Sequence, residues 1–372
     1  MTKANSVMQS PVKDAEVGLP VVITMGDPAG IGPEIIVKAF MQEPDLTGNC
    51  LVAGDVACMR RAAAWVAKGG LPWPVALVEE PLQRQGVPPG CLPVIQVTDV
   101  PSLPEMGKVS AAAGRMAAQS VLWATGAALR EEVLAIVTAP LHKEALFAAK
   151  LPDAMCPGHT EMLQAQSACH MGLDLAYVPV RMMLANDELR TVLVSIHMSL
   201  RHAIDAVTYE SVLETIRITD KSLRWSLGRA PKIAVAGLNP HAGEAGLFGR
   251  EEIDTIEPAI RAAQSEGLNV SGPYPPDTIF MRARRRLGLS AEFDVVIAMY
   301  HDQGLIPVKY LGVEQGVNVT LGLPLIRTSP DHGTAFDIAG QGIADPSSLI
   351  AAIRMAKTMA KTRHKPSLRA SA

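Results

Sequence analysis

Each of three strand-like segments in the second half of the chain is followed by a histidine. The segments, residues 191–196, 233–238 and 295–299, are apolar and contain β-branched side chains, a pattern typical of strands buried on both faces, and the histidines are His197, His241 and His301. Open α/β sheets bind their ligands beyond the carboxyl ends of the strands. Three imidazoles that meet there could hold one divalent metal and leave coordination positions open for a substrate. A lone histidine at a strand end is usually a polar residue with an ordinary partner, so the metal site depends on how the strands are arranged.

A second group of polar residues has the composition of an anion site. His159 and Thr160 stand in a turn where a helix is expected to begin, and a helix N-terminus with these side chains can bind phosphate. The alternative is a turn that only caps the helix. Further along the chain, Lys309, Asn318 and Arg327 could grip a phosphate or a carboxylate, the arginine through its planar fork, or could be ordinary surface residues.

Two glycine-rich loops indicate a bound cofactor without matching a common nucleotide motif. Residues 26–34 (GDPAGIGPE) follow a strand-like segment, and their glycines allow a tight turn and a close approach to a ligand. They contain neither G-x-G-x-x-G nor a Walker sequence, so an ordinary Rossmann site is not supported. Residues 331–346 form a long loop with several functional side chains, and loops this elaborate generally bind a ligand.

Strand-like and helix-like segments alternate through most of the chain. Residues 19–25 and 134–137 have the composition of buried strands, whereas residues 110–129 and 347–362 are expected to be helices. This alternation predicts an α/β protein with a parallel sheet covered by helices. A chain of 372 residues is longer than a single core usually supports, so two domains are expected.

Composition argues against other classes of protein. The net charge of −3 and a pI near 6.3 do not suit a general nucleic-acid binder, and the basic run between Arg282 and Arg286 is expected to be a solvated helix face. Five widely spaced cysteines without a C-x-x-C pair indicate reduced thiols in a cytoplasmic protein. No apolar run reaches the length of about 18 residues that a membrane span needs. Residues 1–18 are polar, lack the apolar centre of a signal peptide and are expected to form a disordered tail.

Five segments in a fixed order resemble the 4-hydroxythreonine-4-phosphate dehydrogenase family. They are GDPAGIGPE (26–34), PGHTE (157–161), NPHAGE (239–244), YHDQG (300–304) and RTSPDHGTA (327–335), and the resemblance extends over nearly the whole chain. It implies the two-domain α/β fold of the related isocitrate and isopropylmalate dehydrogenases, with helices on both faces of parallel or mixed sheets and the active site in the interdomain cleft. Residues 19–140 and 328–366 would form a nucleotide-binding domain, and residues 141–327 a domain for metal and substrate binding and for dimerisation. The family is homodimeric, and each active site is completed by both subunits.

The resemblance also implies roles for individual residues. His197, His241 and His301 would bind a divalent metal, with Asp277 and Asp302 nearby. Zinc suits imidazole ligands best, and cobalt, manganese and magnesium remain alternatives. The substrate would be held by His159, Thr160, Lys309, Asn318 and Arg327. Lys309, Asp277 or Asp302 would take or relay the proton, and the sequence does not distinguish among them.

The loop at residues 331–346 resembles the adenosine-binding loop of the isopropylmalate dehydrogenases. A nicotinamide cofactor would therefore contact His332, Gly333, Asp337 and Asp345. A carboxylate at Asp337 can accept hydrogen bonds from a free ribose and would repel a 2′-phosphate, so we expect NAD rather than NADP.

The resemblance implies an oxidation followed by a decarboxylation. The secondary hydroxyl carbon of 4-phosphooxy-L-threonine would pass a hydride to NAD, and the resulting β-keto acid would lose CO2 to give 3-amino-2-oxopropyl phosphate, a precursor of pyridoxine phosphate. Close paralogues act on threonate or erythronate 4-phosphate and distant ones on an aromatic cis-dihydrodiol dicarboxylate, and residues 25–27 and 194–200 look somewhat closer to the paralogue type. A metabolite-sensing protein without activity would be expected to have lost a metal ligand or an anion-binding residue. A metal-dependent hydrolase would leave the loop at residues 331–346 without a purpose.

Overall fold

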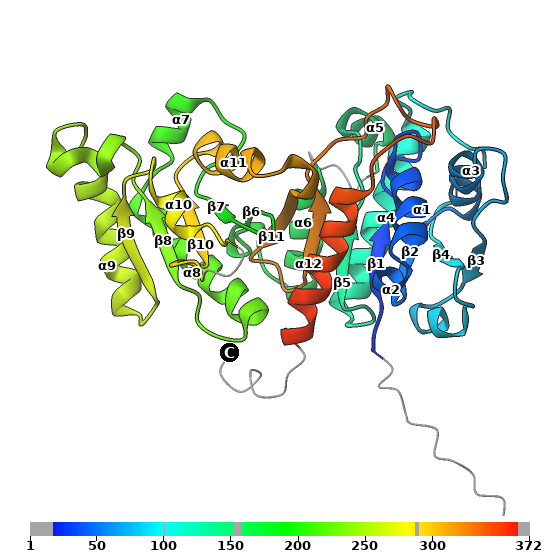
Figure 1. Ribbon diagram of the computed structural model, residues 1–372, viewed down its shortest axis with the longest axis horizontal. Coiled ribbons are helices and arrows are strands. Elements are labelled where there is room, and N and C mark those ends of the chain that lie inside the picture. The colour runs from blue at the N-terminus through cyan, green and yellow to red at the C-terminus, as the bar shows by residue number, and fades with distance from the viewer. Residues whose placement is uncertain (1–17, 100, 152–157, 287–289, 364–372) are drawn as a thin grey trace, which may run out of the picture.

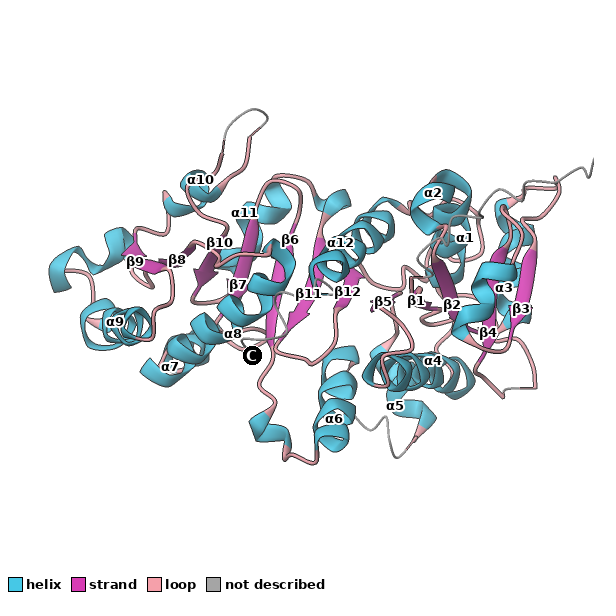
Figure 2. Cartoon of the chain, turned by 90° about the horizontal axis from the view of Figure 1, so that it is seen from below, coloured by secondary structure: helices cyan, strands magenta, loops and turns pink. Residues whose placement is uncertain are grey.

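The protein is built on one continuous sheet with helices on both of its faces. The computed structural model describes residues 18–99, 101–151, 158–286 and 290–363, and in this part of the chain the sheet has 12 strands. Figure 2 shows the strands as a central row with helices above and below it, so the predicted α/β architecture is confirmed. From one edge to the other, the order is β3 (Val75–Val78), β4 (Leu92–Gln96), β2 (Cys50–Gly54), β1 (Val21–Thr24), β5 (Ala135–Thr138), β12 (Arg327–Pro330), β11 (Val317–Leu321), β6 (Arg181–Ala185), β7 (Arg190–Leu193), β10 (Val295–Ala298), β8 (Ile233–Ala236) and β9 (Val270–Tyr274).

The sheet is mixed, whereas the alternation of segments predicted a parallel one. β11 runs antiparallel to β12 and to β6, and β6 runs antiparallel to β7. The other neighbouring strands are parallel, so two parallel halves join through an antiparallel centre. A strand buried on both faces has a similar apolar composition in either direction, which is why the sequence did not indicate this centre. The division into residues 19–140 with 328–366 and residues 141–327 stays a prediction, and the tail at residues 1–17 and the segment 364–366 lie outside the described residues.

The long predicted helices are present. α4 (Ala111–Leu129) and α12 (Ser347–Arg363) occupy the expected segments, and Ser110 caps α4 by accepting a hydrogen bond from Ala113 N at 3.1 Å. α12 packs on β12 and β11 in the middle of the molecule (Figure 1). The other helices are α1 (Gly32–Gln42), α2 (Pro44–Thr47), α3 (Val56–Val66), α5 (Lys143–Ala149), α6 (His159–Met171), α7 (Leu200–Asp205), α8 (Tyr209–Leu227), α9 (Glu257–Ser265), α10 (Ile279–Ala283) and α11 (His301–Tyr310).

The loops after the adjacent parallel strands β1 and β5 are held against each other. Gly26 has a φ of 72°, and a Cβ at this position would lie 2.4 Å from the carbonyl oxygen of Pro140. Asp27 N donates a hydrogen bond to the same oxygen at 2.8 Å. Glycine is therefore required for this close approach, which places the end of β5 and the start of α5 beside the first glycine-rich loop.

The basic run, the cysteines and the helix lengths can each be compared with what the sequence predicted. The basic run does not form a solvated helix face, because α10 ends at Ala283 and the arginines are paired with acidic residues: Arg282 with Glu292, Arg284 with Glu188 and Arg285 with Asp294. The four cysteines in the described residues are free, and Cys156 lies outside them. Among the described helices, none is both long and apolar enough to cross a membrane.

Candidate active site

A polar pocket of about 240 Å³ lies where β12, β11 and β6 meet the loops after β5 and β7. We call it the Arg327 pocket. Its polar side chains come from Thr138, Lys143, His159, Thr160, Glu161, Arg181, His197, Asn318, Thr320, Arg327, Ser329 and His332. The fold thus brings together four of the five predicted substrate-binding residues, one predicted metal ligand and two of the four predicted cofactor contacts.

Arg327 is a buried guanidinium whose hydrogen-bond partners in the described residues are neutral. The residue is 4% exposed, its Nε and Nη2 donate to Thr138 Oγ1 at 3.1 and 2.6 Å, and its Nη1 donates to Thr320 Oγ1 at 3.1 Å. Burial lowers the pKa of Arg327 to about 10, against the attraction of Glu161, so the group is charged at neutral pH. A buried charge held only by hydroxyl groups is costly, and a bound anion would compensate for that cost.

His159 is the first residue of α6, and the arrangement of the pocket keeps it neutral. Its Nε2 atom is buried and has no hydrogen-bond partner among the described residues. Burial, followed by the charges of Arg327 and Lys143, lowers the pKa of His159 well below its ordinary value, although a hydrogen bond to the Ala139 backbone opposes this. An anion bound in the pocket would offset these positive charges and favour the protonated imidazole.

We therefore expect the pocket to take up protons when it binds sulfate, an anion whose own charge is constant near neutral pH. Sulfate affinity should rise as the pH falls from 8 to 6, by up to about tenfold per pH unit, because His159 is neutral in the free protein and charged beside the anion. Titration calorimetry in two buffers of different ionisation enthalpy measures this uptake. His159→Gln should abolish it, and equal apparent enthalpies in the two buffers for the wild type would contradict the assignment.

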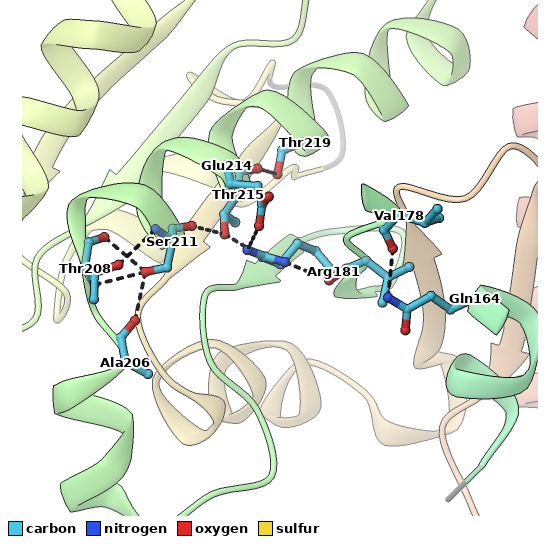
Figure 3. A network of polar contacts seen from close by, with 10 residues as sticks. Gln164, Val178, Arg181, Ala206, Thr208, Ser211, Glu214, Thr215 and Thr219 are labelled. Carbon is cyan, nitrogen blue, oxygen red and sulfur yellow. Dashed lines mark hydrogen bonds and ion pairs between the residues drawn. The ribbon is translucent and has the colours of Figure 1, made fainter. Parts of the chain in front are cut away.

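Thr138, Lys143 and Arg181 are among the residues of the pocket that were not predicted as site residues. Thr138 is the last residue of the buried strand β5 and Lys143 follows five residues later, and this position at a strand end was the available signal. Arg181 is the first residue of β6, and no pattern in the sequence singled it out. Its Nη2 donates to Glu214 Oε2 and its Nε to Thr215 Oγ1, both at 2.7 Å. Figure 3 shows the guanidinium of Arg181 directed at α8, so its charge, unlike that of Arg327, is already neutralised.

His197 and His301 form a pair beyond the ends of the adjacent parallel strands β7 and β10. Their ring centroids are 5.7 Å apart, and both residues line a second pocket of about 470 Å³ with Tyr300 and Asp302. His301 Nδ1 lies 2.7 Å from Asp302 Oδ1. A histidine whose second nitrogen contacts a carboxylate is typical of metal ligands. Because His197 also lines the Arg327 pocket, the two pockets are neighbours.

His241 lies apart from this pair, although β8 is adjacent to β10. It belongs to the segment Pro240–Gly246, in which five successive residues have φ between 45° and 80°, the left-handed region. Its Nδ1 is 3.1 Å from Glu244 Oε2, and its ring meets Phe248 edge-on. In the described residues, no group of three or more histidine, cysteine or acidic side chains is close enough to hold a metal. Within the described part of one chain, the three imidazoles therefore do not meet at one site, and their role as metal ligands stays a prediction.

Of the two predicted acidic residues, Asp277 lies in the same pocket as His241, and Asp302 lines that pocket and the pocket of the histidine pair. A third pocket, of about 720 Å³, contains His241, Asp277, Tyr300 and Asp302, and Asp302 also lines the pocket of the histidine pair. The donor types suit a divalent metal, because imidazole nitrogens and nearby carboxylates are its usual ligands and supporting groups. His197 and His301 could supply two ligands to such a metal. A third ligand would have to come from another part of the chain or from a second copy of it.

The remaining predicted residues lie in or beside the loop at residues 331–346. Lys309 does not line the Arg327 pocket but forms an ion pair with Asp331, with Nζ 2.8 Å from Oδ2. Of the predicted cofactor residues, His332 and Gly333 line the pocket and Asp337 is exposed. Asp345 caps α12, because its Oδ1 accepts hydrogen bonds from Ser347 N at 2.9 Å and Ser347 Oγ at 2.6 Å, which lower the pKa of Asp345.

Glu34 connects this loop to α1 and was predicted only as part of a helix start. Its carboxylate is 1% exposed, and it accepts hydrogen bonds from Gly342 N at 3.1 Å and Ala344 N at 2.7 Å. Lys38 Nζ lies 3.0 Å from the same carboxylate and donates to Ala344 O at 2.5 Å. The two glycine-rich loops, remote in sequence, are therefore one structural unit.

These features define an α/β protein with a buried arginine pocket beside a histidine pair. The chain belongs to the family described as pyridoxal phosphate biosynthetic protein PdxA, whose profile matches residues 47–356. A 4-hydroxythreonine-4-phosphate dehydrogenase of Beijerinckia indica is 51% identical over 331 residues, which are 89% of this chain and 92% of that protein. The D-threonate 4-phosphate dehydrogenase of Salmonella typhimurium is 46% identical over 341 residues, 91% and 98% of the two chains. The crystal structure of 4-hydroxythreonine-4-phosphate dehydrogenase from Klebsiella pneumoniae has a TM-score of 0.80 at 39% identity and covers 92% of this chain and 100% of its own. The predicted family resemblance is confirmed.

Proposed function

We propose that this protein is a metal-dependent, NAD-linked dehydrogenase that oxidises and decarboxylates 4-phosphooxy-L-threonine. The observation that carries the proposal is Arg327, a buried guanidinium with neutral partners in a pocket beside the histidine pair. A phosphate there would meet Arg327, Lys143 and the N-terminus of α6. The other end of a four-carbon substrate would then lie toward His197 and His301. The names of the relatives, which act on phosphorylated four-carbon acids, support the same substrate class.

The side chains would divide the reaction between binding and proton transfer. Arg327, Thr160 and Asn318 would hold the phosphate and orient the secondary hydroxyl. His197, His241 and His301 would hold a divalent metal, zinc by preference, which when bound lowers the pKa of that hydroxyl and stabilises an enolate. Asp302, Asp277 or Lys309 would take the hydroxyl proton while the hydride leaves the same carbon for NAD. The β-keto acid would then lose CO2, and a returning proton would give 3-amino-2-oxopropyl phosphate.

We further infer that two copies of the chain complete each metal site. His241 is separate from the histidine pair within one chain, and large apolar side chains near these histidines are exposed: Leu247, Phe248, Ile306 and Tyr310, the last 90% exposed. Contact with a second copy would bury this apolar surface and bring a further imidazole to the pair.

D-threonate 4-phosphate is the second candidate substrate, because one relative of similar identity is named for it. It carries a hydroxyl where 4-phosphooxy-L-threonine carries an amine, so both would use the same phosphate pocket.

The deciding experiment measures NADH formation by the purified protein with added zinc. The substrates are 4-phosphooxy-L-threonine, D-threonate 4-phosphate, erythronate 4-phosphate and a cis-dihydrodiol dicarboxylate. Preference for 4-phosphooxy-L-threonine supports the proposal. Preference for one of the other substrates would keep the proposed site but change the substrate assigned to it. Absence of turnover with every substrate would overturn the dehydrogenase assignment, and equal use of NADP would overturn the role proposed for Asp337.

Glu34→Gln is expected to raise the KM for NAD by about tenfold and to change kcat by less than about threefold. The amide keeps the shape of the side chain but loses one acceptor, so the hydrogen bonds to Gly342 and Ala344 weaken by about 1–3 kcal/mol and the proposed adenosine loop loosens. Steady-state kinetics and hydrogen exchange of the loop measure the two effects. Glu43→Gln is the matched control, because Glu43 follows the same helix and makes a 3.4 Å ion pair with Arg354 at the surface. An unchanged KM together with a loosened loop would show that the loop does not bind the cofactor.

A further inference from the structure

A fourth polar pocket lies at the opposite end of β7 from His197. It has a volume of about 390 Å³ and is enclosed by the turn between β6 and β7, the segment at Arg285, the end of α1 and one face of α12. Arg190, the first residue of β7, lines it together with Arg285 and Arg354. It shares no lining residue with the Arg327 pocket and contains none of the residues proposed for the reaction.

Arg190 is a half-buried arginine with no carboxylate within ion-pair distance in the described part of the chain. Its guanidinium makes a long hydrogen bond, from Nη1 to the main-chain oxygen of Asp294 at 3.5 Å. The carboxylate of Asp294 is already occupied by Arg229, which donates to both of its oxygens at 2.7 Å, and by Lys232 N at 2.8 Å. Arg285 lies 3.6 Å from the same carboxylate. Most of the five N–H groups of Arg190 are therefore available to a ligand.

The charges around the pocket leave Arg190 short of a counter-ion. Burial, followed by repulsion from Arg285, lowers the pKa of Arg190 to about 10, with Asp294 and Asp187 acting in the opposite direction. Two carboxylates also line the pocket, but Asp187 is exposed at the turn and Glu43 is 3.4 Å from Arg354. A positive group in this environment is stabilised when an anion enters.

We propose that this pocket binds a small oxyanion, with a phosphate or carboxylate group held between the guanidinium groups of Arg190 and Arg285. Each planar fork can donate two parallel hydrogen bonds to such a group. Ser347 lies in the same wall, but its N–H and hydroxyl groups already donate to Asp345, so the two guanidinium groups supply the attraction for the anion. The volume suits a small organic anion as well as inorganic phosphate.

Equilibrium dialysis of the full-length protein with labelled inorganic phosphate, at constant ionic strength, tests this site. The wild type should bind two phosphates per chain, one in the Arg327 pocket and one at Arg190. Arg190→Gln and Arg285→Gln should each leave one, with at least tenfold weaker binding at the altered site. Arg327→Met should retain the phosphate at Arg190, and the double variant Arg190→Gln/Arg327→Met should bind none. Arg261→Gln, which removes an exposed arginine paired with Glu257, controls for net charge and should bind two.

The variants also separate this site from folding and from the proposed reaction. Arg190→Gln removes one long hydrogen bond, so thermal unfolding without phosphate and turnover at saturating substrate should match the wild type. The proposal is overturned if Arg190→Gln and Arg285→Gln bind two phosphates with wild-type affinity, or if Arg327→Met alone removes all binding. If Arg327→Met loses only the phosphate of the Arg327 pocket and keeps the one at Arg190, the site at Arg190 stands even if the protein proves not to be a dehydrogenase. Competition by citrate in Arg327→Met distinguishes a site that accepts carboxylates from one restricted to phosphate.

Discussion

Replacing Arg327 with methionine is expected to lower kcat/KM for the phosphorylated substrate by about 10²- to 10³-fold. Removing one partner of a buried, hydrogen-bonded charge pair costs about 2–5 kcal/mol, and each 1.4 kcal/mol is about tenfold. The loss should appear mainly in KM, because the phosphate is held alike in the ground state and in the transition state. Steady-state measurement of NADH formation over a wide range of substrate concentrations gives both constants.

The same substitution should leave the substrate-free protein as stable as the wild type. Arg327 is bonded to the hydroxyl groups of Thr138 and Thr320, and methionine fills a similar volume without a buried charge. Arg181→Met is the matched control, because Arg181 lines the same pocket but is neutralised by Glu214, so kcat/KM should fall by less than about tenfold. If the two substitutions cost the same, Arg327 does not hold the substrate phosphate as proposed.

Removal of the metal is expected to lower the rate of NADH formation by at least about 10³-fold. A bound divalent cation supplies several kcal/mol of charge stabilisation to a developing alkoxide or enolate, and the described side chains offer no substitute of equal charge. Treatment with a chelator followed by dialysis should abolish activity, and added zinc, cobalt or manganese should restore it. His301→Ala should show the same loss without restoration, and elemental analysis should find less metal in the purified variant.

Two further histidine variants give this prediction its controls. His170 is exposed in the last turn of α6, so His170→Ala should keep both metal and activity. His241→Ala should lose both if a second copy brings this side chain to the pair formed by His197 and His301. A His241→Ala protein with full metal content and full activity would contradict the three-histidine site, whereas the role of the pair would remain.

The sequence by itself determined which chemical groups the protein offers and most of the elements that carry them. Apolar composition and periodicity are local properties, so the strand at β1 and the helices α4 and α12 were predictable. Histidines directly after buried strands and the turn at His159 are also local, and the strand order places His197 and His301 side by side, as that pattern suggested.

Only the tertiary structure decided which of these groups carry an uncompensated charge and which of them meet. Arg327, Arg190 and Arg181 have the same chemistry in the sequence, but only Arg181 meets a carboxylate, supplied by a helix far along the chain. Glu34 looked like part of a helix start and holds a loop about 300 residues away. His241 contacts Glu244 within its own left-handed segment and does not join the pair formed by His197 and His301. Burial, counter-ions and backbone conformation of this kind depend on contacts between remote segments, which no local pattern of residues records.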